Sequence, residues 1–208
     1  MTSSSSSTLS LKQLDKKKSQ FLYTDEMLIS QFQSGDENAY IELVNRYKDK
    51  LTNFVFYLLK DEENAEDIVQ ETFIRLYEKK HYYKEIAKFS TWIYTIARNL
   101  ANTELRKKSR IKIMYLSQMS NHKKDYDLKS FEPELNTNIE NEFLMKEIHI
   151  AIDKLPENYK SVIILRDIQG LDYEQISNVV GVPLGTVKSR INRARLQLQA
   201  DLMDLKKE

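Results

Sequence analysis

The chain has 208 residues, of which 30% are charged and 41% hydrophobic, a composition typical of a globular protein with one or two small domains. Four glycines and three prolines are too few for the many tight turns of a sandwich or barrel of short strands, so an all-α fold is predicted. Cysteine is absent, which excludes disulfides, thiol nucleophiles and zinc–cysteine sites. No apolar run approaches the ~20 residues of a membrane span and no secretory signal is visible, so we expect a cytoplasmic protein without membrane insertion.

Charge is distributed unevenly, although the net charge is only +1. Residues 61–80 carry 3 basic and 7 acidic side chains, whereas residues 81–112 carry 8 basic and 2 acidic ones. Adjacent patches of opposite sign favour two different partners.

The first half of the chain contains a tail and a predicted helical domain. Residues 1–22 combine a serine run with lysines and lack periodicity, which indicates a disordered tail. Apolar residues then recur at helical spacing near 25–34, over 36–58, over 62–79 and from 90 onward. Asp36 and Ser90 are candidate N-caps, and Tyr77 is expected to face the core. Four amphipathic helices with short connections predict one domain over residues 23–110.

The second half contains a linker and a second helical domain. Regular spacing is lost over residues 111–137, which predicts a linker, and returns over residues 138–205. If the linker of about 30 residues is flexible, it reaches ~100 Å when extended but averages only ~30 Å as a coil. We therefore expect the free protein to be more compact than a form stretched along a long partner.

Within the second domain, residues 172–198 have the pattern of a helix-turn-helix. Asp172 and Gln175 form a capping box, Gly181 suits the left-handed turn that ends a short helix, and Pro183 suits the start of the next. The second helix carries four cations within eight residues and no acid: Lys188, Arg190, Arg193 and Arg195. Such a run is suited to phosphates and to guanine edges in a major groove. The alternative is an ordinary helical hairpin with a solvated basic face.

A second stripe lies on the predicted helix that begins near residue 90. Its members recur at spacings of 3, 4, 3 and 4 and change from aromatic to polar to basic: Trp92, Thr95, Asn99, Asn102 and Arg106. Aromatic faces and polar edges can hold unstacked bases while cations hold the phosphates. A plain core role for Trp92 is equally compatible with the pattern.

Neither a cofactor nor a metal is expected. The sequence has no glycine-rich phosphate loop. Glu78 and His81 form its one Glu-x-x-His motif, whereas a di-iron bundle needs two such motifs and two further glutamates.

Four segments resemble a known family. Asp-Tyr-Glu-Gln-Ile-Ser at 172–177, followed by Gly-Val-Pro-Leu-Gly-Thr-Val-Lys-Ser-Arg at 181–190, resembles the promoter-recognition domain of bacterial RNA polymerase sigma factors. Residues 67–77 resemble the sigma segment that binds the polymerase clamp, and residues 89–102 resemble the DNA-melting helix that follows it. The order of the two domains is similar to that of the extracytoplasmic-function (ECF) group of the sigma-70 family.

The resemblance implies a role for each part of the chain. Residues 23–110 would be a region 2-like domain and residues 138–205 a region 4-like domain. Recognition of the minus-35 element would fall to Thr186, Lys188, Ser189, Arg190, Arg193 and Arg195, the last more suited to phosphate. Recognition and melting of the minus-10 element would fall to Phe89, Trp92, Arg98, Asn99, Asn102 and Arg106, with Tyr82, Tyr83 and Lys84 as loop candidates. Polymerase binding would fall to Glu66, Asp67, Gln70, Glu71, Phe73 and Arg75.

The implied protein is a transcription initiation factor and not an enzyme. Its expected partners are core RNA polymerase, promoter DNA and an anti-sigma protein, with no small-molecule substrate. Two alternatives remain open at this point: a helix-turn-helix regulator whose N-terminal helical domain senses a ligand or partner, and a structural adaptor. Stable binding to core polymerase without DNA favours the sigma factor.

Overall fold

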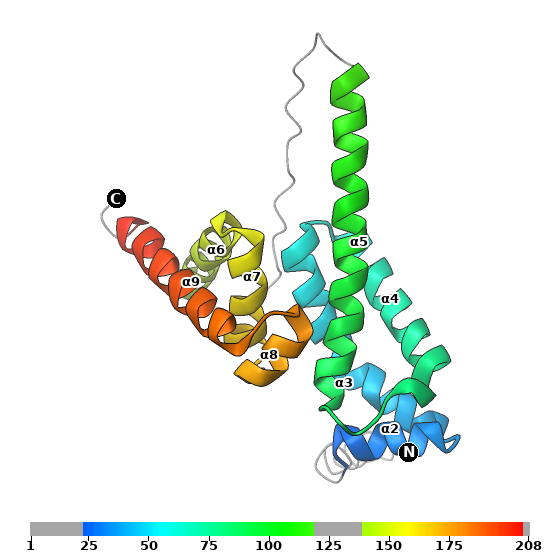
Figure 1. The fold of residues 1–208 in the computed structure, drawn as a ribbon. Helices are drawn as coiled ribbons and strands as arrows, with labels where there is room; N and C mark the ends of the chain where they lie inside the picture. The colour runs from blue at the N-terminus through cyan, green and yellow to red at the C-terminus, as the bar shows by residue number, and fades with distance from the viewer. Residues whose placement is uncertain (1–22, 119–138, 206–208) are drawn as a thin grey trace, which may run out of the picture.

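A computed structural model describes residues 23–118 and 139–205, and both ranges consist of helices joined by short turns (Figure 1). The first domain contains α2 (Asp25–Gln33), α3 (Glu37–Leu59), α4 (Glu62–Lys79), the 3₁₀ turn η1 (Lys80–Tyr82) and α5 (Phe89–Gln118). The second contains α6 (Ile139–Lys154), α7 (Glu157–Ile163), the π-helical turn η2 (Ile164–Ile168), α8 (Tyr173–Val180) and α9 (Leu184–Leu205). The all-α prediction is confirmed. The expected tail, residues 1–22, and residues 119–137 of the expected linker lie outside the described residues.

Side-chain caps fix where the first helices begin. Thr24, Asp36 and Asp61 each accept a hydrogen bond from a backbone amide of the first turn that follows, at 2.9–3.2 Å. Each cap satisfies an amide that has no partner within the helix. The end of α3 lacks a glycine: Lys60 itself adopts the left-handed conformation, with φ 55°, and its amide bonds the Phe56 carbonyl.

Aromatic rings fill the core of the first domain. Phe32, Phe54, Phe89 and Tyr94 are at most 1% exposed, and the rings of Phe54 and Tyr94 meet edge to face with centroids 5.3 Å apart. Burying such rings supplies much of the stabilisation available to a small helical domain. The fully buried side chains of the second domain are smaller and aliphatic, among them Ile164, Leu165 and Ile176.

The capping box and turn predicted for the helix-turn-helix are present. The Gln175 amide donates to Asp172 Oδ1 at 2.8 Å, and the Asp172 amide donates to Gln175 Oε1 at 2.9 Å. Gly181 ends α8 with φ 70°, a conformation that a side chain disfavours. The Ser177 hydroxyl donates to the Val182 carbonyl at 2.6 Å and so fixes the turn between the two helices.

Two expectations for individual residues are wrong. Helix α5 begins at Phe89, so Ser90 lies within its first turn and is not the N-cap. The Ser90 hydroxyl instead accepts a hydrogen bond from Gln175 of the second domain. Tyr77 is 46% exposed instead of buried, because its ring lies against Phe32 and Tyr40 at the edge of the core.

Helix α5 also continues through residues 111–118, which the sequence assigns to the linker. In Figure 1 this end of α5 projects beyond the other helices of its domain. A helix rises ~1.5 Å per residue and an extended chain ~3.4 Å, so this extension shortens the reach of the connection between the domains.

The two domains pack against each other. Helix α8 lies against α5, and α7 with η2 lies against α3 (Figure 1). Helix α9 packs on α6, α7 and α8. The helix-turn-helix is therefore connected to the first domain through α8.

Candidate nucleic-acid interface

The leading half of α9 has a buried side and a cationic open side. Val187, Ile191 and Ala194 are at most 1% exposed and hold the helix against its domain. The intervening positions turn outward: Lys188, Ser189 and Arg193 are exposed, while Thr186 and Arg190 are half-buried. A Cβ placed on Gly185 would meet nothing within 4 Å, so the first turn is narrow and open. This is the form of a helix that can enter a major groove.

Arg195 differs from the other cations of this helix. Its guanidinium forms a two-pronged ion pair with Asp167 of η2, Nε to Oδ2 at 3.0 Å and NH2 to Oδ1 at 2.5 Å. This pairing raises the pKa of Arg195. Its donors are committed within the domain, so a phosphate would have to compete with Asp167 for them.

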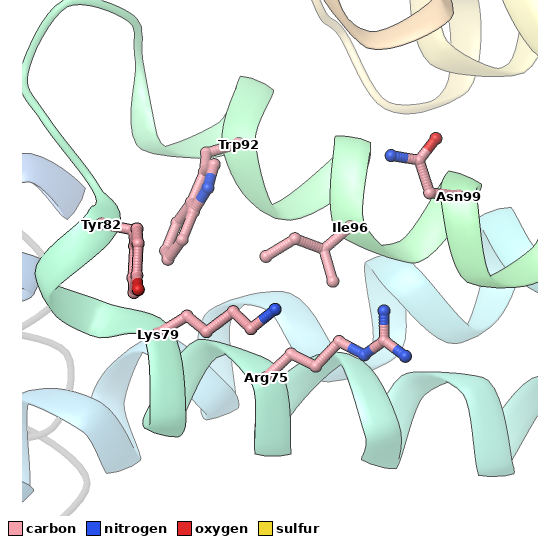
Figure 2. A pocket seen from close by; sticks show the side chains of 6 residues that line it. All are labelled: Arg75, Lys79, Tyr82, Trp92, Ile96 and Asn99. Atoms are coloured by element: carbon pink, nitrogen blue, oxygen red, sulfur yellow. The ribbon is translucent and has the colours of Figure 1, made fainter.

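A pocket of about 350 Å³ lies between α4 and α5. It is lined by Arg75, Lys79, Tyr82, Trp92, Ile96 and Asn99. In Figure 2 the rings of Tyr82 and Trp92 stand at one end, Arg75 and Lys79 extend along the α4 wall, and Asn99 stands at the far end. The pocket therefore combines aromatic faces, two cations and an amide, the groups that an unstacked nucleotide requires.

Trp92 combines the two roles that the sequence left open. It is half-buried and packs against Tyr83 and Phe89, with ring centroids 5.5 and 6.3 Å apart, yet it also lines the pocket. Tyr82 is 78% exposed at the same pocket. The packing on one side of Trp92 fixes the ring while its other side remains available.

Two aromatic candidates for DNA contact belong to the core instead. Phe89 is 0% exposed and Tyr83 is 8% exposed. The Tyr83 hydroxyl donates to the Ala87 carbonyl at 2.8 Å, and Phe89 packs edge to face with Tyr47. Neither ring can stack on a base in this conformation. Both rings instead pack against the buried side of Trp92.

The polar residues of the predicted α5 stripe have different surroundings. Asn99 borders the pocket, Asn102 is half-buried, and Arg106 is exposed. Arg98 lies on another face, where NH1 donates to the Val179 carbonyl of α8 at 3.3 Å. Burial lowers the pKa of Arg98, and the nearby Arg190 and Arg106 act in the same direction.

Sequence reasoning missed part of this pocket. The resemblance assigns Arg75 to polymerase binding and does not single out Lys79, yet both line the pocket. Their i, i+4 spacing on α4, next to an aromatic and polar helix of the same domain, is the signal that could have found them.

The acidic face of α4 remains open to a partner. Glu66, Asp67 and Gln70 are exposed, whereas the half-buried Glu71 pairs with Arg75 at 2.8 Å. Phe73, which the resemblance groups with them, is buried. Its backbone carbonyl accepts a hydrogen bond from the Tyr40 hydroxyl. Ile74, 51% exposed, and Tyr77 add apolar surface to this helix that the sequence pattern did not identify.

In residues 23–118 and 139–205, no three His, Asp or Glu side chains are grouped so that they could hold a metal ion. In the same ranges no helix is both long and apolar enough to cross a bilayer.

Comparison with known proteins identifies the family. Residues 43–111 match Sigma-70 region 2 and residues 145–198 match Sigma-70, region 4. The chain is 35% identical over 184 residues to the ECF RNA polymerase sigma factor SigW of Bacillus subtilis, an alignment that covers 85% of this chain and 96% of the relative. The chain belongs to the ECF group of the sigma-70 family.

Other relatives agree with this assignment. The RNA polymerase sigma-H factor of Pseudomonas aeruginosa is 32% identical over 187 residues, covering 88% of this chain and 96% of the relative. A solved structure of the sigma factor RpoE with the anti-sigma factor NepR, from Bartonella quintana, superposes with a TM-score of 0.66 at 24% identity over 79% of this chain and 96% of that one. CnrH, solved with the cytosolic domain of CnrY, gives a TM-score of 0.62 at 22% identity over 87% and 97%. At these identities the two structures show the fold.

Family membership establishes the general activity. A sigma factor directs transcription initiation through RNA polymerase and is not an enzyme. Its partners are core RNA polymerase and promoter DNA. The region 2 match spans α4, the pocket and most of α5, and the region 4 match contains the helix-turn-helix. The alternative of a regulator with a sensing domain is set aside, because the first domain is region 2.

Proposed function

We propose that the leading half of α9 recognises the minus-35 element of the promoter. The supporting observation is that Lys188, Ser189 and Arg193 lie exposed on one helix whose opposite side is buried. Thr186 and Arg190 flank this surface and are half-buried. Bidentate contacts from such cations to guanine discriminate bases by ~1–3 kcal/mol each.

The pocket between α4 and α5 is the proposed site for the minus-10 element, and it carries the finer part of this proposal. A base leaving the duplex would stack on Trp92 or Tyr82, and Asn99 would bind a base edge at the rim. Lys79 and Arg75 would hold the phosphates of the displaced strand. Stacking contributes ~1–3 kcal/mol per base, similar to the cost of unstacking one, so a few contacts hold open DNA without nucleotide hydrolysis.

Helix α4 is the proposed contact with core polymerase. Glu66, Asp67 and Gln70 offer an exposed acidic and polar face, and Ile74 and Tyr77 add apolar surface. An apolar centre with a charged rim is a common form of a specific protein interface. Phe73 would act there only by supporting the helix from the core.

An anti-sigma protein is the proposed regulator. Two structural relatives were solved as complexes with an anti-sigma factor or with the cytosolic domain of a partner. Since RNA polymerase works in the cytoplasm, we place the function of this chain there as well.

Start-site mapping tests the proposed function. Core polymerase and the purified chain are incubated with genomic DNA, and the 5′ ends of the transcripts are sequenced. We expect defined start sites that share two upstream elements, and permanganate-reactive thymines in the element nearer the start. Transcripts without shared elements would contradict the proposal.

A further inference from the structure

A short segment connects the two rings of the pocket, Tyr82 and Trp92. Tyr82 ends η1, Trp92 lies in the first turn of α5, and residues 83–88 join the two helices. Tyr82 is 78% exposed, so packing in the core does not fix its position. A 3₁₀ turn of three residues is short, and among the described residues η1 has no side-chain cap, so its geometry depends on contacts from another element.

Gln33, the last residue of α2, supplies such a contact. Its side-chain Nε2 donates to the Lys80 carbonyl at 2.6 Å and to the Tyr83 carbonyl at 3.1 Å. These two carbonyls lie before and after Tyr82 in the chain. Because an amide group has two N–H donors, both donors of Gln33 are used on this turn. The backbone around Tyr82 is therefore fixed to α2.

Lys80 strengthens the contact from the opposite direction. Its ammonium donates to the Phe32 carbonyl of α2 at 2.9 Å and lies over the Phe32 ring, 4.1 Å from the centroid. The end of α2 and η1 thus exchange hydrogen bonds in both directions. Phe32 is 0% exposed, so the group that anchors η1 is itself held by the core.

Glu26, near the start of α2, holds the other end of the segment. Its Oε1 accepts a hydrogen bond from the backbone amide of Phe89 at 3.1 Å. Phe89 is the first residue of α5, where an amide has no partner within the helix and a carboxylate is favourable. Glu26 therefore fills the capping role that was expected of Ser90. Helix α2 contacts both η1 and α5 and lies next to the loop that leads into α5 (Figure 1).

Tyr83 connects these contacts to Trp92. The Tyr83 ring packs against Phe89 and Trp92, with centroids 5.9 and 5.5 Å apart, and its hydroxyl donates to the Ala87 carbonyl at 2.8 Å. Burial, followed by the nearby Glu26, raises the pKa of Tyr83 to about 12, so the hydroxyl keeps its proton and remains a donor. A shift of the Tyr83 backbone would therefore move the surface against which Trp92 packs.

We propose that Gln33 and Glu26 are positioning residues for capture of the minus-10 element. They act through residues 80–89, by holding Tyr82 and Trp92 at a fixed separation across the pocket. A preorganised pocket binds an unstacked base more tightly than one whose walls must first be ordered. This inference rests on the proposed assignment of the pocket to the minus-10 element.

Binding of single-stranded DNA by the holoenzyme tests Gln33. Gln33→Met keeps the length of the side chain and removes both donors. We expect roughly tenfold weaker binding of a non-template minus-10 oligonucleotide from a promoter found by start-site mapping, with unchanged affinity for core polymerase and for a minus-35 duplex. Gln31→Met is the matched control, because the Gln31 side chain forms no hydrogen bond with any described residue. Unchanged oligonucleotide binding by Gln33→Met would overturn the role of Gln33.

A double-mutant cycle distinguishes positioning from general support of the fold. Tyr82→Ala removes the ring that Gln33 is proposed to hold. Adding Gln33→Met to this variant should therefore weaken oligonucleotide binding by at most about threefold more, because the two residues act together. A further loss of the full tenfold would show that Gln33 acts independently of Tyr82 and would contradict the proposal.

Glu26 is tested by a pair of substitutions. Glu26→Met removes the acceptor for the Phe89 amide, whereas Glu26→Gln keeps an acceptor oxygen on a side chain of the same length. We expect several-fold weaker oligonucleotide binding in Glu26→Met and near-normal binding in Glu26→Gln. Normal binding in both variants would exclude a role for Glu26, and equal losses in both would assign the effect to its charge and contradict the proposal.

Fluorescence provides a measurement on the free protein, because Trp92 is the only tryptophan of the chain. We expect acrylamide to quench Trp92 more strongly in Gln33→Met than in Gln31→Met, while the far-ultraviolet circular dichroism of both stays helical. Identical quenching in the two variants would overturn the proposed hold of α2 on the segment.

The Trp92→Ala variant separates this inference from the proposed function. If Trp92→Ala weakens oligonucleotide binding and Gln33→Met does not, the positioning role fails and the assignment of the pocket stands. If neither Trp92→Ala nor Tyr82→Ala weakens it, the assignment of the pocket to the minus-10 element fails, and the positioning role fails with it.

Discussion

The two faces of α5 differ in how their polar groups are paired. Toward the second domain, Ser90, Tyr94 and Arg98 each form a hydrogen bond with α8 or with the segments next to it. Toward α4, the side chains of Trp92 and Asn99 line a pocket and form no hydrogen bond with any described residue. A face whose donors are satisfied within the chain has less to gain from a ligand than a face whose groups are unpaired. Helix α5 thus contacts the second domain with one face and presents unpaired polar and aromatic groups to the pocket with the other.

The largest effect is expected on the open face. Trp92→Ala removes a stacking surface, and we expect ~1–3 kcal/mol less stabilisation of melted DNA, roughly a 5- to 150-fold loss of open complex. Permanganate footprinting of the holoenzyme measures this directly. Trp92→Phe should restore part of the effect, and thermal unfolding separates a loss of folding from a loss of stacking. Normal melting by a folded Trp92→Ala variant would remove the pocket from the mechanism.

Recognition by α9 gives a similar or smaller change. Arg193→Ala or Lys188→Ala should impair minus-35 recognition by ~1–3 kcal/mol if the side chain contacts a base, while binding to core polymerase is retained. Binding to a matched and to a mutated minus-35 fragment gives the discrimination ratio. Gln199→Ala, an exposed change farther along the same helix, is the control. Intact promoter choice and affinity in Arg193→Ala would show that the recognition surface is misassigned.

Binding to core polymerase should respond more weakly to a single charge. Asp67→Ala removes one exposed carboxylate from α4 and is expected to weaken core binding by about 1 kcal/mol, roughly fivefold. Asp49→Ala makes the same charge change on an exposed site of α3 and should have no effect. Equal losses in both variants would indicate a general electrostatic effect instead of a specific contact.

Sequence patterns predicted the local features well. The cap at Asp36, the capping box of Asp172 and Gln175 and the turn at Gly181 each depend on residues within four positions of one another. The cationic face of α9 follows in the same way from helical spacing. Such features depend on local backbone geometry, which propensity and spacing describe.

Features that depend on distant residues were not predicted. Ser90 has the chemistry of an N-cap, but its hydroxyl faces Gln175, 85 residues away. Phe89 and Tyr83 have the chemistry of base-stacking residues, but they are covered by the core. The pocket needs Lys79 and Trp92 from two helices at once. Periodicity identifies which residues share a helical face, and only the packing of the helices decides what that face meets.

The smallest expected effect concerns pH and the contact between Tyr57 of α3 and His149 of α6. Burial and the neighbouring Lys60 lower the pKa of His149, while Asp153 of the same helix opposes them. If the second domain separates from α3, His149 regains its ordinary pKa of about 6.5. The packing of His149 on Tyr57 is therefore favoured above that pH and weakened as the pH falls below it. Asp172 of the second domain pairs with Lys88, which directly precedes α5, at 3.1 Å. The backbone amide of Gln175 and then Lys88 lower the pKa of Asp172, so it stays ionised in this range.

Solution scattering of the free protein between pH 7.5 and 5.5 measures this effect. We expect the radius of gyration to rise as the pH falls. Each unit by which the pKa of His149 is lowered can change the ratio of packed to separated domains by at most about tenfold, so the rise is small. His149→Gln cannot be protonated in this range and should flatten the profile while the far-ultraviolet spectrum stays helical. An identical rise in the His149→Gln variant would assign the expansion to other groups, and the contact between Tyr57 and His149 would then be insensitive to acid.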